Sequence, residues 1–590
     1  MKKRILSALL AFLMIFSVVA LASCDASSSK KDDTADSGDE TSVTARVPLT
    51  LTMWLPAAEG TEVDDESVAQ VEKAINAITQ AEYQTAIKLK VLPADEYDAA
   101  VSEKMYGIKA VAEAEEEAAA QKRKEQREAA AKGEEYVDTG SAVDNTLAVE
   151  EENEFAALNA SVFTGYPKVE NTQFDIFVMH GVKDYVSYYN DLMLCELEDF
   201  ISDGNNVLYD YIHPNFFNHI TTDGGIEIPI CMIPNNHAAG AYQVMLINKE
   251  VADSLDYDAE KFTSVKTLFD YDTSGISFIE DVARNRPDVT PVCGTYSAPY
   301  VSYFNEDSDA SEFSIVSSAV GADSVYADLE ILNTFKNVNF VDYMTYSKRI
   351  REASAPVAWG STDNFAVGFT TVTGREIEEY SDKYQVVVIE NPHPTADQIF
   401  ESGFAVSKYT SDKTGERAME IITLINTNSK LRTILQYGVE GTHWKQDVDD
   451  ESVIQIISDK YKMDMIETGN AFITYPGDGQ PMSDWDPDKK QNLASFYPIT
   501  SSFKYQDAET TTPLLQELAT LSADMWARVD AMSSAQFTEN LPALRNEVDA
   551  LNCVSRLLYV PKADGNDPAG TILDESLIFR WQEFCKEIAE

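Results

Sequence analysis

The 590-residue chain has few of the residues that build metal centres and disulfide frameworks: six cysteines and six histidines. The five cysteines after Cys24 are widely spaced and include no Cys-x-x-Cys pair, which fits neither a disulfide framework nor a zinc site. The histidines show no metal-ligand spacing. We therefore expect these cysteines to be buried thiols. The alternative is that two of them form a single disulfide bridge. The five cysteines are Cys195, Cys231, Cys293, Cys553 and Cys585.

The sequence motifs of common enzymes are absent as well. No Gly-x-Ser-x-Gly, His-Glu-x-x-His, Walker phosphate loop or Gly-x-Gly-x-x-Gly occurs. We therefore expect a protein that is not an enzyme and that needs no cofactor. One enzyme class stays open, because the many acidic residues would allow the carboxylate pair of a glycosidase.

Basic residues are scarce relative to acidic ones. The chain has 46 Lys and Arg against 99 Asp and Glu, a net charge of −53. Such a charge argues against a nucleic-acid partner. It also repels anionic lipid headgroups, so a membrane contact would have to come from a lipid anchor rather than a basic patch.

The N-terminus has the layout of an export signal. Lys2, Lys3 and Arg4 precede an apolar run over residues 5–22, and the run ends in Leu-Ala-Ser before Cys24. This ending resembles the bacterial lipobox, which implies that residues 1–23 are removed and Cys24 is acylated. We expect an exported lipoprotein on the outer face of the cell membrane. The alternative is plain secretion with Cys24 as a free thiol.

The residues after Cys24 separate into a tether and a long body. Residues 24–46 are mostly Ser, Asp, Thr and Lys and bury too little apolar surface to fold. The body over residues 47–590 is too long for one core, so two or three domains are expected.

The first part of the body alternates strand and helix signals. Strands are predicted at 48–54, 86–92 and 174–179, and apolar residues at helical spacing from Val68 to Ile78 predict a helix between the first two. This order predicts a parallel sheet with crossover helices. An insertion at about 99–160 interrupts it, and its Ala-, Glu-, Lys- and Arg-rich centre at 109–136 predicts a protruding helix, with a partner-binding coiled coil as the alternative.

The rest of the body reads as a second mixed α/β region followed by helices. Two strands are predicted within 226–250, later strands or loops are predicted at 356–369 and 384–389, and residues 403–407 lead into a helix. Helices are predicted at 417–426 and 430–437, and residues 501–590 are predicted to be mostly helical. The fold class is therefore α/β, with mixed sheets flanked by helices.

Several segments, in their order, carry a resemblance to a known family. The chain resembles the extracellular solute-binding proteins of bacterial ABC importers, in the family 1-like group that captures sugars and oligosaccharides. The segments are LTLTMWLPA at 49–57, DIFVMHG at 175–181, IEIPICM at 226–232, VMLINKE at 244–250, ERAMEIITLINTNSKLRTILQYGVEGTHW at 416–444 and TGNAFITYP at 468–476. The insertion at 99–160 departs from the usual family pattern.

The resemblance implies a two-lobed Venus-flytrap fold with discontinuous lobes. It implies a first lobe of residues 47–238 and 404–495, a second of 239–403 and 496–590, and crossings near 233–243, 400–406 and 495–505. A monomer would hold a saccharide between the lobes and deliver it to a membrane permease. The alternatives are an anchored glycosidase, a peptide-binding receptor of the same fold and a surface adhesion module.

The candidate ligand contacts are aromatic, amide and acidic residues, the groups that saccharide sites use. Trp359 matches a family position that often stacks on sugars, and His180 follows a strand at its carboxyl end, where open α/β sheets bind ligands. Three further residues lie at the predicted first crossing and are either ligand contacts or hinge residues. Structural roles stay open for all of them. The candidates are Trp359, Trp54, His180, Asn236, His237, Tyr242, Glu440, Trp444 and Tyr300.

One stretch partly matches a calcium-binding loop. In DYDTSGISFIED, acidic, hydroxyl and glycine residues fall at positions 1, 3, 5, 6 and 12 of such a loop. Position 8 is Ser277 instead of an apolar residue, and position 12 is Asp instead of Glu, so a capped turn is the alternative. The residues concerned are Asp270, Asp272, Ser274, Gly275 and Asp281.

Overall fold

The structure is a computed structural model. It describes residues 46–132, 163–169, 173–201, 206–212, 216–217, 229–270, 275–297, 301, 303–304, 313–318, 331–410, 412–496, 512–559 and 576–582. The predicted signal, Cys24 and almost all of the tether lie outside this range. By its internal contacts the chain divides into Met1–Arg46 and Val47–Glu590, and every element below belongs to the second unit. Among the described helices, none is long and apolar enough to cross a membrane.

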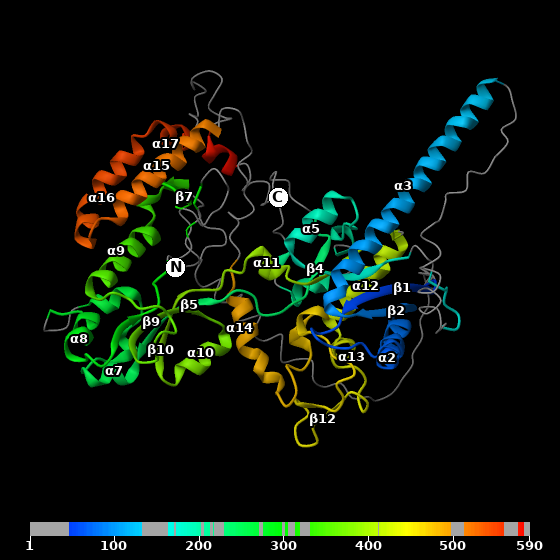
Figure 1. The fold of residues 1–590 in the computed structure, drawn as a ribbon, viewed down its shortest axis with the longest axis horizontal. Helices are drawn as coiled ribbons and strands as arrows, with labels where there is room; N and C mark the ends of the chain where they lie inside the picture. Colours follow the sequence, from blue (N-terminus) through cyan, green and yellow to red (C-terminus); the bar gives the residue numbers. More distant parts are fainter. Residues whose placement is uncertain are drawn as a thin grey trace, which may run out of the picture. The chain divides into compact units, whose positions relative to one another are not determined.

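The first sheet has five strands in the order β2-β1-β3-β11-β4 (Figure 1). Strand β1 pairs in parallel with β2, from Leu49 opposite Thr85, and with β3, while β11 runs antiparallel to both β3 and β4. The predicted parallel sheet is confirmed, and β11 makes it mixed. The strands are β1 (Leu49–Pro56), β2 (Thr85–Leu92), β3 (Ile176–Met179), β4 (Met232–Pro234) and β11 (Gly403–Val406).

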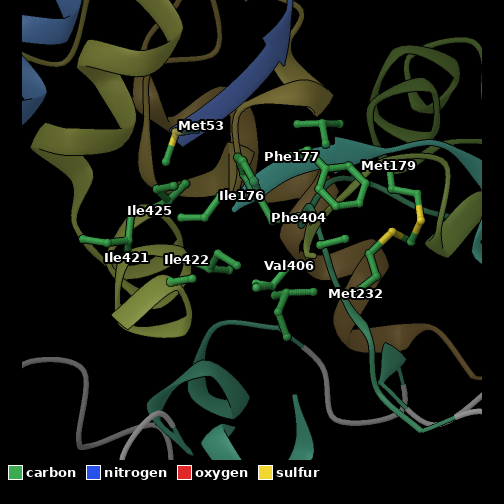
Figure 2. Close-up of a cluster of buried hydrophobic side chains, with 14 of the residues drawn as sticks. Met53, Ile176, Phe177, Met179, Met232, Phe404, Val406, Ile421, Ile422 and Ile425 are labelled. Atoms are coloured by element: carbon green, nitrogen blue, oxygen red, sulfur yellow. The ribbon is translucent and has the colours of Figure 1, made fainter. Parts of the chain in front are cut away.

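Helix α2 (Asp65–Tyr83) makes the crossover between β1 and β2, as its apolar spacing predicted. It begins after Asp64, whose side chain accepts a hydrogen bond from the Ser67 backbone amide. Val71 and Ile75 of α2 are fully buried against the sheet. Helix α12 (Asp412–Thr427) packs on the same core. Figure 2 shows its side chains Ile421, Ile422 and Ile425 beside side chains from the strands of the sheet.

The second sheet has four strands in the order β10-β5-β9-β6. Strand β5 is antiparallel to β9 and β10, and β6 is parallel to β9. Successive residues of β5 point to opposite faces of the sheet and pack in two different cores, Met245 on one face and Val244 on the other. The sheet is therefore covered on both sides. The strands are β5 (Tyr242–Asn248), β6 (Thr290–Cys293), β9 (Phe365–Val372) and β10 (Tyr384–Glu390).

The C-terminal helices form a separate apolar core with α9 (Val338–Ala353). The prediction of a mostly helical C-terminal region is confirmed for its described part. The ammonium of the buried Lys348 donates to the carbonyls of Val529 and Asp530, the last two residues of α15, and of Met532 just beyond it, at 2.7, 3.0 and 2.8 Å. It thereby supplies donors where a helix end offers carbonyls that lack an intrahelical hydrogen bond. The helices are α15 (Thr512–Asp530), α16 (Ser534–Asp549) and α17 (Asn552–Leu557).

Helix α3 (Ala94–Lys132) begins earlier than the sequence predicted. Its first four turns belong to the core of the first sheet, through Tyr97, Val101, Met105 and Ile108. From residue 109 to 132 none of its residues is buried, which agrees with a solvated helix. The remainder of the predicted insertion, residues 133–160, lies outside the described residues.

The chain passes between the two sheets through segments without regular strands. The first crossing segment, residues 235–241, joins β4 to β5, and the second, residues 391–402, joins β10 to β11 and contains the short helix α11 (Ala396–Ile399). The second crossing therefore ends where β11 begins, earlier than the predicted 400–406. Most of the predicted third crossing lies outside the described residues, and the lobe boundaries stay a prediction.

The remaining elements are short or connect those above. They are α5 (Gly181–Asn190), α6 (Glu198–Phe200), η2 (Asn206–Asp210), α7 (Lys249–Ser254), η4 (Ala259–Lys261), η5 (Val265–Phe269), α8 (Phe278–Asn285), β7 (Val316–Ser318), β8 (Ile331–Asn333), η6 (Thr334–Lys336), α10 (Gly374–Ser381), α13 (Ser429–Tyr437), β12 (Trp444–Gln446), β13 (Ile454–Ile456), η7 (Met465–Glu467), η8 (Ala471–Ile473), η9 (Met482–Trp485) and α14 (Asp486–Ala494).

Candidate functional site

One edge of the first sheet collects the ends of four parallel strands. Strands β2, β1, β3 and β4 all finish at this edge, and the antiparallel β11 starts there. From β1 the chain goes to β2 on one side, and β3 lies on the other, so the strand order reverses at β1. Open α/β sheets bind ligands outside the carboxyl ends of strands at such a reversal.

His180 follows β3 at this edge and is held between two carboxylates. Its Nδ1 lies 2.6 Å from Asp98 Oδ1, and its Nε2 lies 2.9 Å from Glu467 Oε2. Burial lowers the pKa of His180, but the hydrogen bonds and charges of Asp98 and Glu467 outweigh it and raise the pKa from 6.5 to about 10. The ring is therefore an imidazolium at neutral pH. His180 is also the N-cap residue of α5, although its side chain makes no cap hydrogen bond.

A chain of hydrogen bonds continues from Glu467 into both crossing segments. Ser402 Oγ donates to Glu467 Oε2 at 2.8 Å, and Asn235 Nδ2 donates to Ser402 Oγ at 2.9 Å. The Asn235 backbone amide also donates to the Ser402 carbonyl at 3.0 Å. The two crossing segments are thus bonded to each other at the edge where the parallel strands end.

Asn236 is buried and uses both ends of its amide. Its Nδ2 donates to the Tyr211 carbonyl at 2.7 Å and lies 3.3 Å from Asn470 Oδ1, and its Oδ1 accepts from Asn492 Nδ2 at 3.2 Å. With its hydrogen bonds made within the chain, Asn236 has a structural role in the crossing. The tyrosine that it holds, Tyr211, is 40% exposed.

His237 lies in the same crossing, as predicted from its position in the sequence, and Tyr242 directly follows the crossing. Burial lowers the pKa of His237, so its ring is neutral at neutral pH. Tyr242 begins β5 and is buried in one of the cores of the second sheet. His180, Asn236 and His237 therefore occupy the edge and the crossing that leaves it, and Tyr242 lies at the far end of that crossing.

Trp359 lies elsewhere. Its side chain is 39% exposed, and its ring centroid is 5.5 Å from that of Phe365. Phe365 is hydrogen-bonded through its carbonyl to Asn248, the last residue of β5, whereas Tyr242 at the other end of β5 adjoins the crossing. A strand of seven residues spans about 20 Å, so Trp359 packs near the end of the second sheet that is remote from the crossing.

The two other predicted tryptophans are buried and packed within the chain. Trp54 is 3% exposed, packed edge-on to Phe174 with the Lys90 ammonium 3.8 Å from its ring centroid. Trp444 is buried and its Nε1 donates to the Gly438 carbonyl, while Glu440 is exposed in the same turn. Tyr300 lies outside the described residues.

The calcium-like stretch is only partly described. Asp272 and Ser274 lie outside the described residues. Ser277 begins α8 with a capping box to Glu280, which is the alternative considered for this stretch. Within the described ranges, no group of three or more His, Cys, Asp or Glu residues is placed to hold a metal ion.

The described cysteines are free thiols. Cys231, Cys293 and Cys553 are buried, as expected, while Cys195 is partly exposed. Burial raises the pKa of Cys231 to about 12, so this thiol is protonated and unreactive at neutral pH. Cys585 lies outside the described residues.

Five residues of this site were absent from the sequence prediction: Asp98, Tyr211, Asn235, Ser402 and Glu467. The only available signal was positional, because Asn235 directly follows β4 and Ser402 directly precedes β11. Asp98 and Glu467 are 82 and 287 positions from His180, and nothing in the sequence distinguishes them from the other acidic residues.

Comparison with known proteins gives matches among solved structures only: no family model matches, and neither does any curated protein. The N-glycan transport solute binding protein NgtS from Streptococcus pneumoniae is 16% identical with a TM-score of 0.48, covering 92% of this chain and 100% of that chain. A solute-binding protein from Bifidobacterium longum infantis, described as HMO-binding and ABC-transporter-associated, is 12% identical with a TM-score of 0.40, covering 92% and 99%. A family 1 extracellular solute-binding protein from Alicyclobacillus acidocaldarius is 9% identical with a TM-score of 0.36, covering 85% and 98%.

Proposed function

We propose that this chain is the solute-binding protein of an ABC importer, which captures a sugar or oligosaccharide and delivers it to a membrane permease. The observation that carries the proposal is the bonded pair of crossing segments at the carboxyl edge of the first sheet. A receptor that closes on its solute needs a site next to the segments that join its two halves, because solute contacts must favour the closed state.

The chemistry of this edge suits a hydroxyl-rich solute. It presents amide, hydroxyl and carboxylate groups, and the partly exposed ring of Tyr211 lies on a segment that Asn236 holds against the crossing. Saccharides combine hydroxyl groups with apolar faces that stack on aromatic rings. The carboxylates Asp98 and Glu467 are both bonded to His180, which supports binding over the proton transfer that a glycosidase requires.

Ligand-induced stabilisation tests this function. Full chain extracted in detergent is heated with maltotriose, cellotriose, chitotriose, mannotriose or a tripeptide, and Tm is recorded. A cognate saccharide at one hundred times its Kd is expected to stabilise the protein by about 2.7 kcal/mol. The same mixture is assayed for new reducing ends. Their release would support the glycosidase, and a shift by the tripeptide alone would support the peptide receptor.

Replacing Tyr211 by alanine is expected to weaken binding of the saccharide that raises Tm. The loss should be about tenfold or more, roughly 1.4 kcal/mol, as for an aromatic anchor at a binding site. Calorimetry gives the affinity, and Tm without ligand should hardly change because the side chain is 40% exposed. Trp359→Ala is the matched comparison. A loss in that variant alone would place the solute against the second sheet.

We also propose that Cys24 carries lipid, that the mature protein is held at the outer face of the membrane, and that it acts as a monomer. A clickable fatty acid supplied to cells should label the wild-type chain and leave Cys24→Ser unlabelled. Label on the variant would contradict acylation at this position.

A further inference from the structure

Asn235 has the most deeply buried side-chain amide of the first crossing segment, at 2% exposure. The oxygen of this amide has no hydrogen-bond partner among the described residues. Its Nδ2 donates to Ser402 Oγ at 2.9 Å and to the Ile466 carbonyl at 2.7 Å, which uses both amide hydrogens. Its Oδ1 is buried and accepts no hydrogen bond from the described residues. The side-chain amide cannot be flipped to exchange its oxygen and nitrogen, because the Ile466 carbonyl is only an acceptor and requires the nitrogen on its side.

His237, two residues further on, also has a buried polar atom without a hydrogen-bond partner among the described residues. Its Nε2 is buried with no hydrogen-bond partner in the described structure. Glu401 Oε2 lies 3.9 Å from it, which is beyond hydrogen-bonding distance. Because burial keeps this ring neutral, Nε2 either donates or accepts one hydrogen bond, depending on the tautomer.

Both side chains face the same segment of the chain. Asn235 is bonded to the Ile466 carbonyl, and His237 feels the charges of Glu467 and Asp464. Asn236 between them also reaches this segment, because its Nδ2 lies 3.3 Å from Asn470 Oδ1, but its amide is fully used by Tyr211, Asn470 and Asn492. The two unpartnered atoms therefore belong to the part of the crossing that contacts residues 464–470, next to the chain of bonds that leads from Asn235 through Ser402 and Glu467 to His180.

We infer that Asn235 Oδ1 and His237 Nε2 form a receiving site for a hydroxyl group of the bound saccharide. Asn235 Oδ1 needs a donor and His237 Nε2 takes either role, and a hydroxyl both donates and accepts. A carboxylate or phosphate oxygen has no hydrogen to give Asn235 Oδ1, so the site favours neutral saccharide over anionic solutes. The inference rests on the proposed function, and a bound water offers the same chemistry without a solute.

His237→Phe tests the inference, since it keeps a ring of similar shape and removes both nitrogens. The affinity for the saccharide that raises Tm in the panel above is expected to fall at least tenfold by calorimetry. The Tm without saccharide is expected to stay level or rise, because the variant removes a buried nitrogen that has no partner. A structural histidine would instead give a lower Tm with unchanged affinity.

His443→Phe is the matched control. His443 is 1% exposed, and its Nδ1 accepts a hydrogen bond from the Val439 amide at 2.9 Å, so this variant should lose Tm and keep its affinity. Equal saccharide affinities of wild type and His237→Phe would overturn the inference and leave the proposed function standing. A lower Tm with unchanged affinity would assign the site to water and also overturn it. If no saccharide of the panel bound the wild type, the proposed function would fail, and the inference with it.

Discussion

Arg432→Ala is expected to lower the free energy of unfolding by about 4 kcal/mol, the largest effect that we expect from a single substitution. Arg432 is fully buried in α13, and its guanidinium donates to the Asn470 and Met465 carbonyls at 3.1 and 2.7 Å and to Gln436 Oε1 at 2.9 Å. Burial lowers its pKa to about 9, so it is still charged at neutral pH. Alanine would leave a cavity and two buried carbonyls without these donors.

Denaturant unfolding of the full chain gives the magnitude. Lys430→Ala, an exposed position in the same helix, is the control and should change stability by less than about 0.5 kcal/mol. Arg432→Met fills most of the space without supplying donors, so the difference between the Met and Ala variants separates packing from hydrogen bonding. An Arg432→Ala protein as stable as the Lys430→Ala control would show that the 465–470 segment does not depend on this guanidinium.

His180→Gln is expected to cost about 2–3 kcal/mol at low pH and progressively less as the pH rises. The folded protein raises the pKa of His180 from 6.5 to about 10. Such a group contributes its full stability below pH 6.5, where the unfolded chain also holds the proton, and loses it as the pH rises through 10. The magnitude is discounted from the full shift because the side chain is 26% exposed.

Unfolding curves of wild type and variant across this pH range measure the effect. His443→Gln is the control with the opposite sign, since burial lowers the pKa of His443 and its charging disfavours the folded state at acid pH. The stability gap between wild type and His180→Gln should narrow with rising pH. A gap that is constant with pH would mean that His180 is not held as an imidazolium by Asp98 and Glu467.

Local sequence signals were enough for most of the first sheet. The apolar spacing of α2 and the alternating pattern of strand β1 depend on neighbours close in sequence, and both elements have the predicted character. Antiparallel β11 was less visible as a sheet member, because its pairing joins Gly403 to Met179 and Pro234, far apart in the chain. The hydrophobic pattern of a segment indicates that it is a strand but does not show which strands it pairs with.

The candidate site was predictable only in part, for a related reason. His180 was found from its place after a strand, but its role depends on Asp98 and Glu467, which only the folded chain brings to it. Trp54 shows the opposite difficulty, since an aromatic residue at a strand end looks the same in sequence whether a core or a ligand covers it. Here Phe174 and Lys90 cover the ring.

The late position of β11 also bears on how the protein is made. In the first sheet β11 lies between β3 and β4, although both are synthesised well before Gly403. Until that residue has emerged, the inner edges of β3 and β4 lack their native neighbour, and pairing across so long a stretch of chain is slow. Before the chain is complete, the N-terminal half therefore has unpaired strand edges, and holding chaperones and low temperature during this period should raise the yield of native protein.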